Sequence, residues 1–169
     1  MRGLKQTSST VAIGFSVSET GANTFTQGST DLNLSPLDNE VFVVLAANME
    51  VEMPDAIGAT DTAVTASLTT TSQTAVQSLA NTNCLAVNNA YIRGAGLIDG
   101  GVGFLTGGAE SPPASLDYLG IIATNDFFVQ VAGGNNLLSK GVSGKIYGFR
   151  ARAESSIYSA LVQGEVLSA

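Results

Sequence analysis

The residues most able to do chemistry are four carboxylates that lie close to one another in the sequence. Glu50 and Glu52 are two positions apart and share one face of a strand, and Asp55 and Asp61 follow in a Gly/Ala/Asp segment. Hard cations such as Ca²⁺ bind several oxygen ligands, and a carboxylate pair can act as general acid and base. The same acids could form a solvated strand end that resists edge-to-edge aggregation. The sequence leaves all three interpretations open.

Most of the positive charge lies in two short segments. Six of the seven cations are Arg2, Lys5, Lys140, Lys145, Arg150 and Arg152. Arg2, Lys5, Arg150 and Arg152 could contact nucleic acid or pair with acids on a neighbouring subunit, and ordinary surface charge is the plain alternative. The net charge of −7 argues against a dedicated nucleic-acid binder, which is usually basic. We therefore expect weak or no direct binding of nucleic acid.

Several catalytic chemistries are excluded by composition. The chain has no histidine, which rules out Ser-His-Asp and Cys-His sites and histidine-containing zinc sites. Its one cysteine, Cys84, allows no intramolecular disulfide and is expected to be a small buried apolar residue. The glycine-rich segment 94–108 has the wrong spacing for a dinucleotide-binding motif. We expect no enzyme and no cofactor, with a structural Ca²⁺ as the one exception left open.

Residues 40–54 are expected to form a long central strand. The odd positions from Val41 to Met53 are all apolar, which is the period of a strand with one buried face. In the first half Phe42 and Val44 make the other face apolar as well. Something besides the sandwich core must then cover this half: the N-terminal segment, a C-terminal helix or a neighbouring subunit. Phe42 and Val44 are therefore predicted interface residues.

The rest of the chain repeats the alternating pattern between turn signals. Strands are expected at 10–18, 24–26, 62–71, 84–92, 117–123, 127–132 and 141–153, whereas 72–83 could be strand or short helix and 94–108 should be loop-rich. Helical spacing of apolar residues predicts a helix over 155–167, capped by Ser155 or Ser156. Residues 1–9 are predicted to form a flexible arm. The pattern predicts an all-β domain over 10–169, of about eight antiparallel strands in a sandwich, jelly roll or barrel.

The surface is poor in charge. Charged residues make up 12% of the chain, about half of the usual share of ~25%, while hydrophobic residues make up 44%. The surface is then either a neutral one rich in Thr and Ser, or one largely hidden in protein contacts, whose cores are depleted of charge. No apolar run is long enough for a membrane span, and the N-terminus lacks the apolar core of a signal peptide. A soluble chain is expected.

Two segments give the chain a family resemblance. They are DNEVFVVLAANMEVE at 38–52, like a long central strand, and KIYGFRARAESSIYSALV at 145–162, a last strand running into a helix. With its short polar arm, the chain resembles single jelly-roll coat proteins of small icosahedral viruses, of the kind found in viruses of prokaryotes. The resemblance implies a self-assembling capsid subunit without an active site, in a large homo-oligomer with other virion proteins as further partners. It also implies location in the virion after a soluble stage, with Ile157, Leu161 and Val162 as interface residues.

Two further classes of function stay open. A phage tail, spike or decoration protein would trimerise or bind a pre-formed shell. A β-sandwich that binds carbohydrate or mediates adhesion would usually present exposed aromatic rings. This chain has no Trp, seven Phe and four Tyr, and most of these fall at expected core positions.

Overall fold

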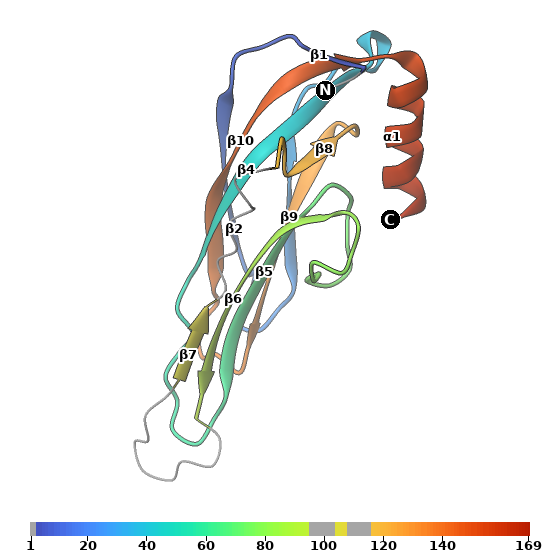
Figure 1. Cartoon of the computed structure of the whole chain (residues 1–169). Coiled ribbons are helices and arrows are strands. Elements are labelled where there is room, and N and C mark those ends of the chain that lie inside the picture. The colour runs from blue at the N-terminus through green and yellow to red at the C-terminus, as the bar shows by residue number, and fades with distance from the viewer. Residues whose placement is uncertain (1–2, 95–103, 108–115) are drawn as a thin grey trace.

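The computed structural model describes residues 3–94, 104–107 and 116–169, with the backbone alone for 104–107. These ranges hold ten strands, one short 3-10 helix (Pro36–Asp38) and one α-helix. The elements are β1 (Leu4–Gln6), β2 (Val11–Ser18), β3 (Thr26–Asp31), β4 (Glu40–Val51), β5 (Thr62–Thr69), β6 (Cys84–Arg93), β7 (Phe104–Gly107), β8 (Gly120–Ile122), β9 (Asp126–Gly134), β10 (Gly141–Ala153) and α1 (Ser155–Leu167). The strands run along the long axis of an elongated molecule (Figure 1).

Two antiparallel sheets pack face to face. Sheet A has the order β2-β10-β4-β8, with β1 beside the far end of β10, and sheet B has the order β3-β9-β5-β6-β7. Apart from β1 and β7, the first strand pairs with the last, the second with the second-last, and so on inward: β2 with β10, β3 with β9, β4 with β8, β5 with β6. This is a long hairpin folded over itself, the topology of a jelly roll. The predicted fold class is confirmed.

The central strand β4 turns its even-numbered residues toward the core in its first half and its odd-numbered residues in its second half. Phe42 and Val44 point into the core between the sheets, whereas Val41 and Val43 lie on the outer face of sheet A. The pairing with β10 then skips one residue of β4, Leu45, because Tyr147 lies opposite Ala46 and Gly148 opposite Val44. After this bulge the odd positions turn inward, so that the Ala47, Met49 and Val51 side chains pack against the core.

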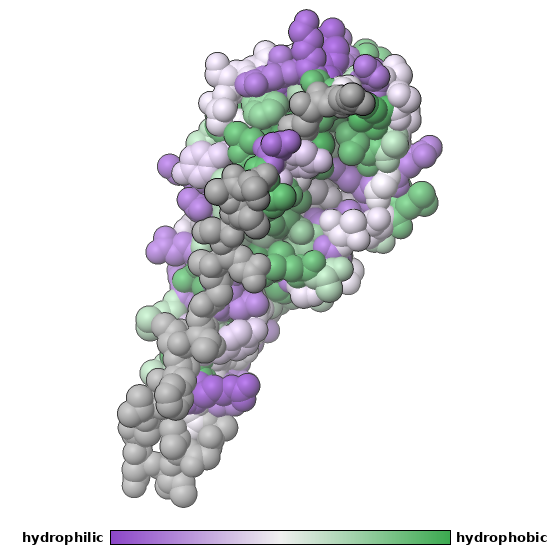
Figure 2. Space-filling view, viewed as in Figure 1, coloured by the Kyte–Doolittle hydropathy of each residue, from purple (hydrophilic) through white to green (hydrophobic). Residues whose placement is uncertain are grey.

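Helix α1 covers the outer face of sheet A at one end. Its span confirms the predicted 155–167, but its N-cap residue is Glu154, which makes no side-chain cap, in place of Ser155 or Ser156. The helix lies beside the upper end of the sandwich (Figure 1), and hydrophobic residues gather near it and β8 in Figure 2, below a hydrophilic upper rim. Among the described residues, no helix combines the length and apolar character needed to cross a membrane.

Some local predictions are wrong. Residues 4–6 of the expected flexible arm form β1, paired with Ala151–Ala153. The strand expected at 24–26 runs over Thr26–Asp31 instead. Residues 72–83 are neither strand nor helix: they form turns that lie on the outer face of sheet B through neutral side-chain hydrogen bonds, such as those from Gln77 N–H to Ser67 Oγ and from Gln73 N–H to Gln27 Oε1. The loop-rich 94–108 contains β7, and its residues 95–103 and 108 lie outside the described ranges.

Candidate assembly interface

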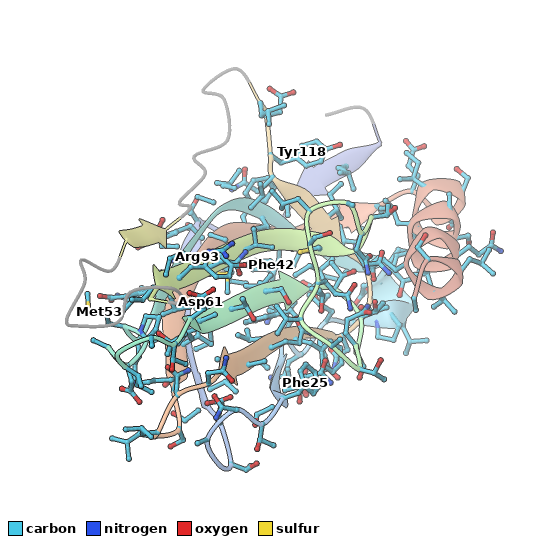
Figure 3. The ribbon with its side chains drawn as sticks, turned by 90° about the horizontal axis from the view of Figure 1, so that it is seen from below. Phe25, Phe42, Met53, Asp61, Arg93 and Tyr118 are labelled. Carbon is cyan, nitrogen blue, oxygen red and sulfur yellow. The ribbon has the colours of Figure 1, made fainter. Side chains whose placement is uncertain are left out.

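One end of the sandwich presents large apolar side chains to solvent. Leu137 and Leu138, in the connection from β9 to β10, are 74% and 68% exposed. Met53, in the neighbouring connection from β4 to β5, is 65% exposed and projects from the edge of the molecule (Figure 3). We call Leu137 and Leu138 the loop tip. Isolated exposed leucines are common on proteins, but two adjacent ones on a fixed backbone suit a contact with another molecule.

The backbone of the loop tip is held by one carboxylate. Asp55 Oδ2 accepts hydrogen bonds from the Leu137 and Leu138 N–H groups at 2.8 and 3.2 Å. Its Oδ1 pairs with Lys140 Nζ at 2.6 Å, and the Lys140 side chain is only 10% exposed. The Asp55 N–H donates to Asn136 Oδ1 at 2.9 Å. The hydrogen bond from Lys140, more than any other contact, holds the pKa of Asp55 below its ordinary value, so Asp55 is ionised at neutral pH.

A second layer of hydrogen bonds fixes the base of the same loop. Glu19, 5% exposed, accepts the Gly133 N–H on Oε1 at 2.6 Å and the Lys140 N–H on Oε2 at 2.9 Å. Asn23 and Asn136 exchange two bonds, from Asn23 Nδ2 to the Asn136 carbonyl and from the Asn136 N–H to Asn23 Oδ1. Three connections of the jelly roll are thereby tied together. Because this framework fixes the backbone that carries the two leucines, that backbone needs no ordering when a partner binds, which lowers the entropy cost of binding.

Helix α1 is fastened by a different kind of carboxylate. The Glu165 side chain is buried, with the residue 7% exposed, and accepts hydrogen bonds from the Ala123 and Thr124 N–H groups at 2.8 and 3.0 Å. The backbone carbonyl of Glu165 accepts a further hydrogen bond from Asn83 Nδ2 at 3.1 Å. None of the four ion pairs among the described residues includes Glu165. Burial without a cation raises the pKa of Glu165.

The predicted interface residues have different outcomes. Phe42 and Val44 are 1% and 0% exposed inside the sandwich, so their prediction as subunit contacts is wrong. The cover that the first half of β4 needs is provided by α1, over Val41 and Val43. Three helix residues predicted for the interface, Ile157, Leu161 and Val162, are half-buried against this cluster within the same chain.

The four carboxylates considered as candidate cation ligands do not come together. Asp55 pairs with Lys140, and Asp61 pairs with Arg93 at 3.4 Å, while Glu52 Oε2 accepts the Gly141 N–H and Glu50 is exposed. In the described parts of the chain, no group of three or more His, Cys, Asp or Glu residues could hold a metal ion. In the described structure these four acids are therefore not gathered into one cluster, and the interpretation of them as a joint cation site gains no support.

The predicted cationic residues are largely engaged within the chain. Arg150 donates to Glu40 at 3.2 Å and to the carbonyls of Leu32 and Asn33. Arg152 pairs with Asp38 at 2.9 Å. Lys5 is exposed and lies opposite Arg152 in the pairing of β1 with β10, and Arg2 lies outside the described residues. The arginines thus secure the connection from β3 to β4.

The loop tip was not among the predicted site residues, although a signal for it exists. Two leucines follow the strong turn sequence Gly133-Gly134-Asn135-Asn136, at a place where the chain must reach the surface. The supporting partners, Glu19 and Asp55, are 114 and 82 positions from Gly133 and Leu137, so no local pattern reveals them. The chain matches no protein-family model, no curated protein and no solved structure.

Proposed function

We propose that this chain is a structural subunit that assembles with copies of itself into a closed shell, the capsid of a virion. The observation that carries the proposal is the loop tip, two exposed leucines on a backbone fixed by the partly buried Asp55–Lys140 ion pair. The jelly roll supports the proposal less, because one fold serves many functions. The assembled shell is the location that we propose for the chain.

The energetics of such a contact are compatible with assembly. Burying one leucine side chain contributes about 1.5–3 kcal/mol, so a single contact through the loop tip is weak. A closed symmetric particle repeats the contact in every subunit, and each subunit holds several neighbours at once. The low share of charged residues, 12%, also suits a surface that is hidden in protein contacts. Since the net charge is −7 and Arg150 and Arg152 are paired with acids, we propose no direct contact with nucleic acid.

The proposal is tested by the size of the purified protein with and without the loop tip. Leu137 and Leu138 are both replaced by Ser, and Leu79→Ser serves as control, because Leu79 is 47% exposed in the connection from β5 to β6. Light scattering and electron microscopy should show large particles for the wild-type chain and the control. The double variant should stay small while keeping the wild-type circular dichroism spectrum.

Two results would contradict the proposal. One is a wild-type chain that stays monomeric at high concentration in every salt condition. The other is a double variant that forms particles as well as the wild type. A small defined oligomer, such as a trimer, would favour a tail, spike or decoration protein instead.

A further inference from the structure

One edge of sheet A is a long strand with a free side. Strand β2 pairs with β10 on one side, and in the described parts of the chain no strand pairs with its other side. It runs along one margin of the molecule (Figure 1). A free strand edge presents unpaired N–H and C=O groups, which readily accept a further strand. The free side of β2 is therefore a place where another chain can add a strand to the sheet.

The backbone groups on this free side belong to the even-numbered residues of β2. The Glu19 N–H donates to the Lys140 carbonyl at 2.9 Å, so these two residues form a hydrogen-bonded pair at the end of the ladder. In an antiparallel ladder such pairs recur at every second residue, so the odd-numbered residues of β2 point their N–H and C=O groups at β10. The groups on the free side then belong to four exposed residues, Ala12, Gly14, Ser16 and Ser18.

This edge has none of the features that usually keep strand edges apart. Such features are charged side chains, proline, bulges and very short strands. Strand β2 is eight residues long, contains no charged residue and no proline, and pairs with β10 without a register shift. The other edge strands of the described sheets differ, because β1 and β8 have three residues, β7 has four and β3 ends in the charged Asp31. An unprotected edge of this length suits a chain in which it is covered by a defined partner.

We propose that β2 pairs with β2 of a second copy of this chain, antiparallel and about a two-fold axis. With Phe15 opposite Phe15 of the second copy at the axis, Gly14 lies opposite Ser16 and Ala12 opposite Ser18. Every N–H and C=O group on the free side then has a partner, whereas moving the axis to Gly14 or Ser16 leaves one residue of each copy without one. The facing side chains at the even positions are small and uncharged, so none repels its counterpart.

The neighbouring strand also favours a second copy as the partner. Lys145 of β10 lies opposite Gly14, is exposed, and belongs to none of the four ion pairs among the described residues. Because Gly14 has no side chain, the Lys145 side chain can extend over it toward the Ser16 hydroxyl of the second copy, two strand spacings or about 10 Å away. The two-fold axis repeats this contact, since each copy offers the same donor and the same acceptor.

This pairing and the proposed shell can fail separately. The residues on the free side of β2 are distinct from the loop tip, and the pairing makes a dimer whether or not larger particles form. A wild-type chain that stops at a dimer through β2 would contradict the shell and leave the pairing standing. A Leu137→Ser, Leu138→Ser chain that is monomeric, beside a wild type that forms particles, would do the reverse.

Sedimentation equilibrium of the Leu137→Ser, Leu138→Ser chain tests the pairing, because that chain should form no large particles. We expect a dissociation constant on the order of 10–100 μM, so the measurement covers about 1 μM to about 1 mM. Ser16→Pro, added to this chain, removes an N–H that points at the second copy and none that points at β10, so it should fold. Ser16→Lys places a cation beside Lys145 of the second copy. Ser143→Lys is the matched control, because Ser143 is exposed and lies opposite Ser16 on β10.

We expect a dimer for the chain with the loop-tip changes alone and for the Ser143→Lys control. The dimer should be at least about tenfold weaker with Ser16→Pro and with Ser16→Lys. Circular dichroism checks that each chain is folded, and if Ser16→Pro is not, Ser16→Lys decides. A monomer at the highest concentration would leave the edge to a strand of another protein and overturn the proposal. An unchanged dimer in a folded Ser16 variant would overturn it as well.

A disulfide between copies tests the register in particles as well as in dimers. Gly14→Cys and Ser16→Cys chains are co-expressed, since the pairing places these positions opposite each other with Cα atoms about 5.5 Å apart, within reach of a disulfide. A Cβ at Gly14 would lie 3.8 Å from the Gly144 carbonyl oxygen, an ordinary contact, so this variant should fold. Mild oxidation should link the mixed chains into covalent pairs at least about fivefold more than either variant alone, as seen on a non-reducing gel. Equal linking in all three samples, or none in the mixture, would overturn the pairing.

Discussion

At the residue scale, the close approach of the strands in sheet A depends on a glycine of β10. Gly148 lies opposite Val44, next to the bulge at Leu45. A Cβ at position 148 would overlap the carbonyl oxygen of Val43 and lie 2.6 Å from the ring of Phe42. Neither neighbour can move easily, since one is backbone in the middle of a sheet and the other is 1% exposed. Glycine is therefore required here by space.

The first prediction follows from that lack of space. Gly148→Ala should lower the free energy of unfolding by about 1–3 kcal/mol or more, as overpacking of a core does. Gly14→Ala is the matched control on the neighbouring strand β2, because its Cβ would lie 3.8 Å from the Gly144 carbonyl oxygen in ordinary contact. Its effect should stay within about 0.5 kcal/mol. Urea unfolding measures both, and equal losses in the two variants would contradict the packing described for Gly148.

Glu165 is the residue that should make the docking of α1 depend on pH. Burial raises its pKa above the ordinary 4.5, so the folded chain binds this proton more tightly than the unfolded chain does. The resulting contribution to stability is fully present below pH 4.5 and is lost as the pH rises through the folded-state pKa. Acidification from neutral pH should therefore strengthen the attachment of the helix.

The second prediction compares Glu165 with its uncharged counterpart. The melting temperature of the wild type minus that of Glu165→Gln should increase as the pH is lowered from 7 toward 4.5. Other titrating groups contribute equally to both chains and cancel in the difference. Thermal unfolding followed by circular dichroism at several pH values provides the measurement. Parallel curves for the two chains would show that Glu165 does not titrate in this range.

At the scale of elements, regular patterns could be predicted and their irregularities could not. The last strand and the helix were predicted with the bounds that the structure has, Gly141–Ala153 and Ser155–Leu167, because period and turn signals agree there. In β4 the apolar odd positions continue straight through the bulge at Leu45, so the sequence gives no sign that the buried face changes. For the same reason Phe42 and Val44 were placed on an interface, although they lie in the core.

The loop tip is a site that local sequence patterns could not predict. Each connection contributes residues that look ordinary by themselves, such as Glu19 or Asp55. They form a site only because the folded-over hairpin brings the connections β2–β3, β4–β5 and β9–β10 together at one end of the sandwich. Predicting the site would have required the strand order first, since none of the bonds that support it is local in sequence.

The third prediction concerns the attachment of α1 to sheet A. Leu161 is half-buried against the cluster that contains Val41 and Val43. Leu161→Ala should lower the free energy of unfolding by about 1–2 kcal/mol, less than for a fully buried leucine. Hydrogen exchange should accelerate in α1 and leave β5 unchanged, because β5 belongs to the other sheet. Leu167→Ala is the control, since Leu167 is 84% exposed, and an equal effect in both variants would argue against this packing.

At the scale of the whole molecule, the two ends are secured by carboxylates with opposite acid–base behaviour. Asp55 has a lowered pKa because of Lys140, so its contribution to stability is present above its ordinary 3.8 and is lost as the pH falls through the folded-state value. Glu165 contributes in the opposite sense. Between pH 7 and about 4.5 the loop tip should therefore keep its geometry while the helix end becomes more firmly attached.

The last prediction tests whether the loop tip is covered in the assembled particle. The only cysteine, Cys84, is 9% exposed and burial raises its pKa, so the wild-type chain should react slowly with thiol reagents. A thiol introduced by Leu138→Cys or by Leu79→Cys should react quickly in the dissociated chain. In particles, whose size is checked first by light scattering, the thiol at 138 should react at least about tenfold more slowly while the thiol at 79 is unaffected. If both react equally fast in intact particles, the subunits are held together elsewhere and the loop tip has another role.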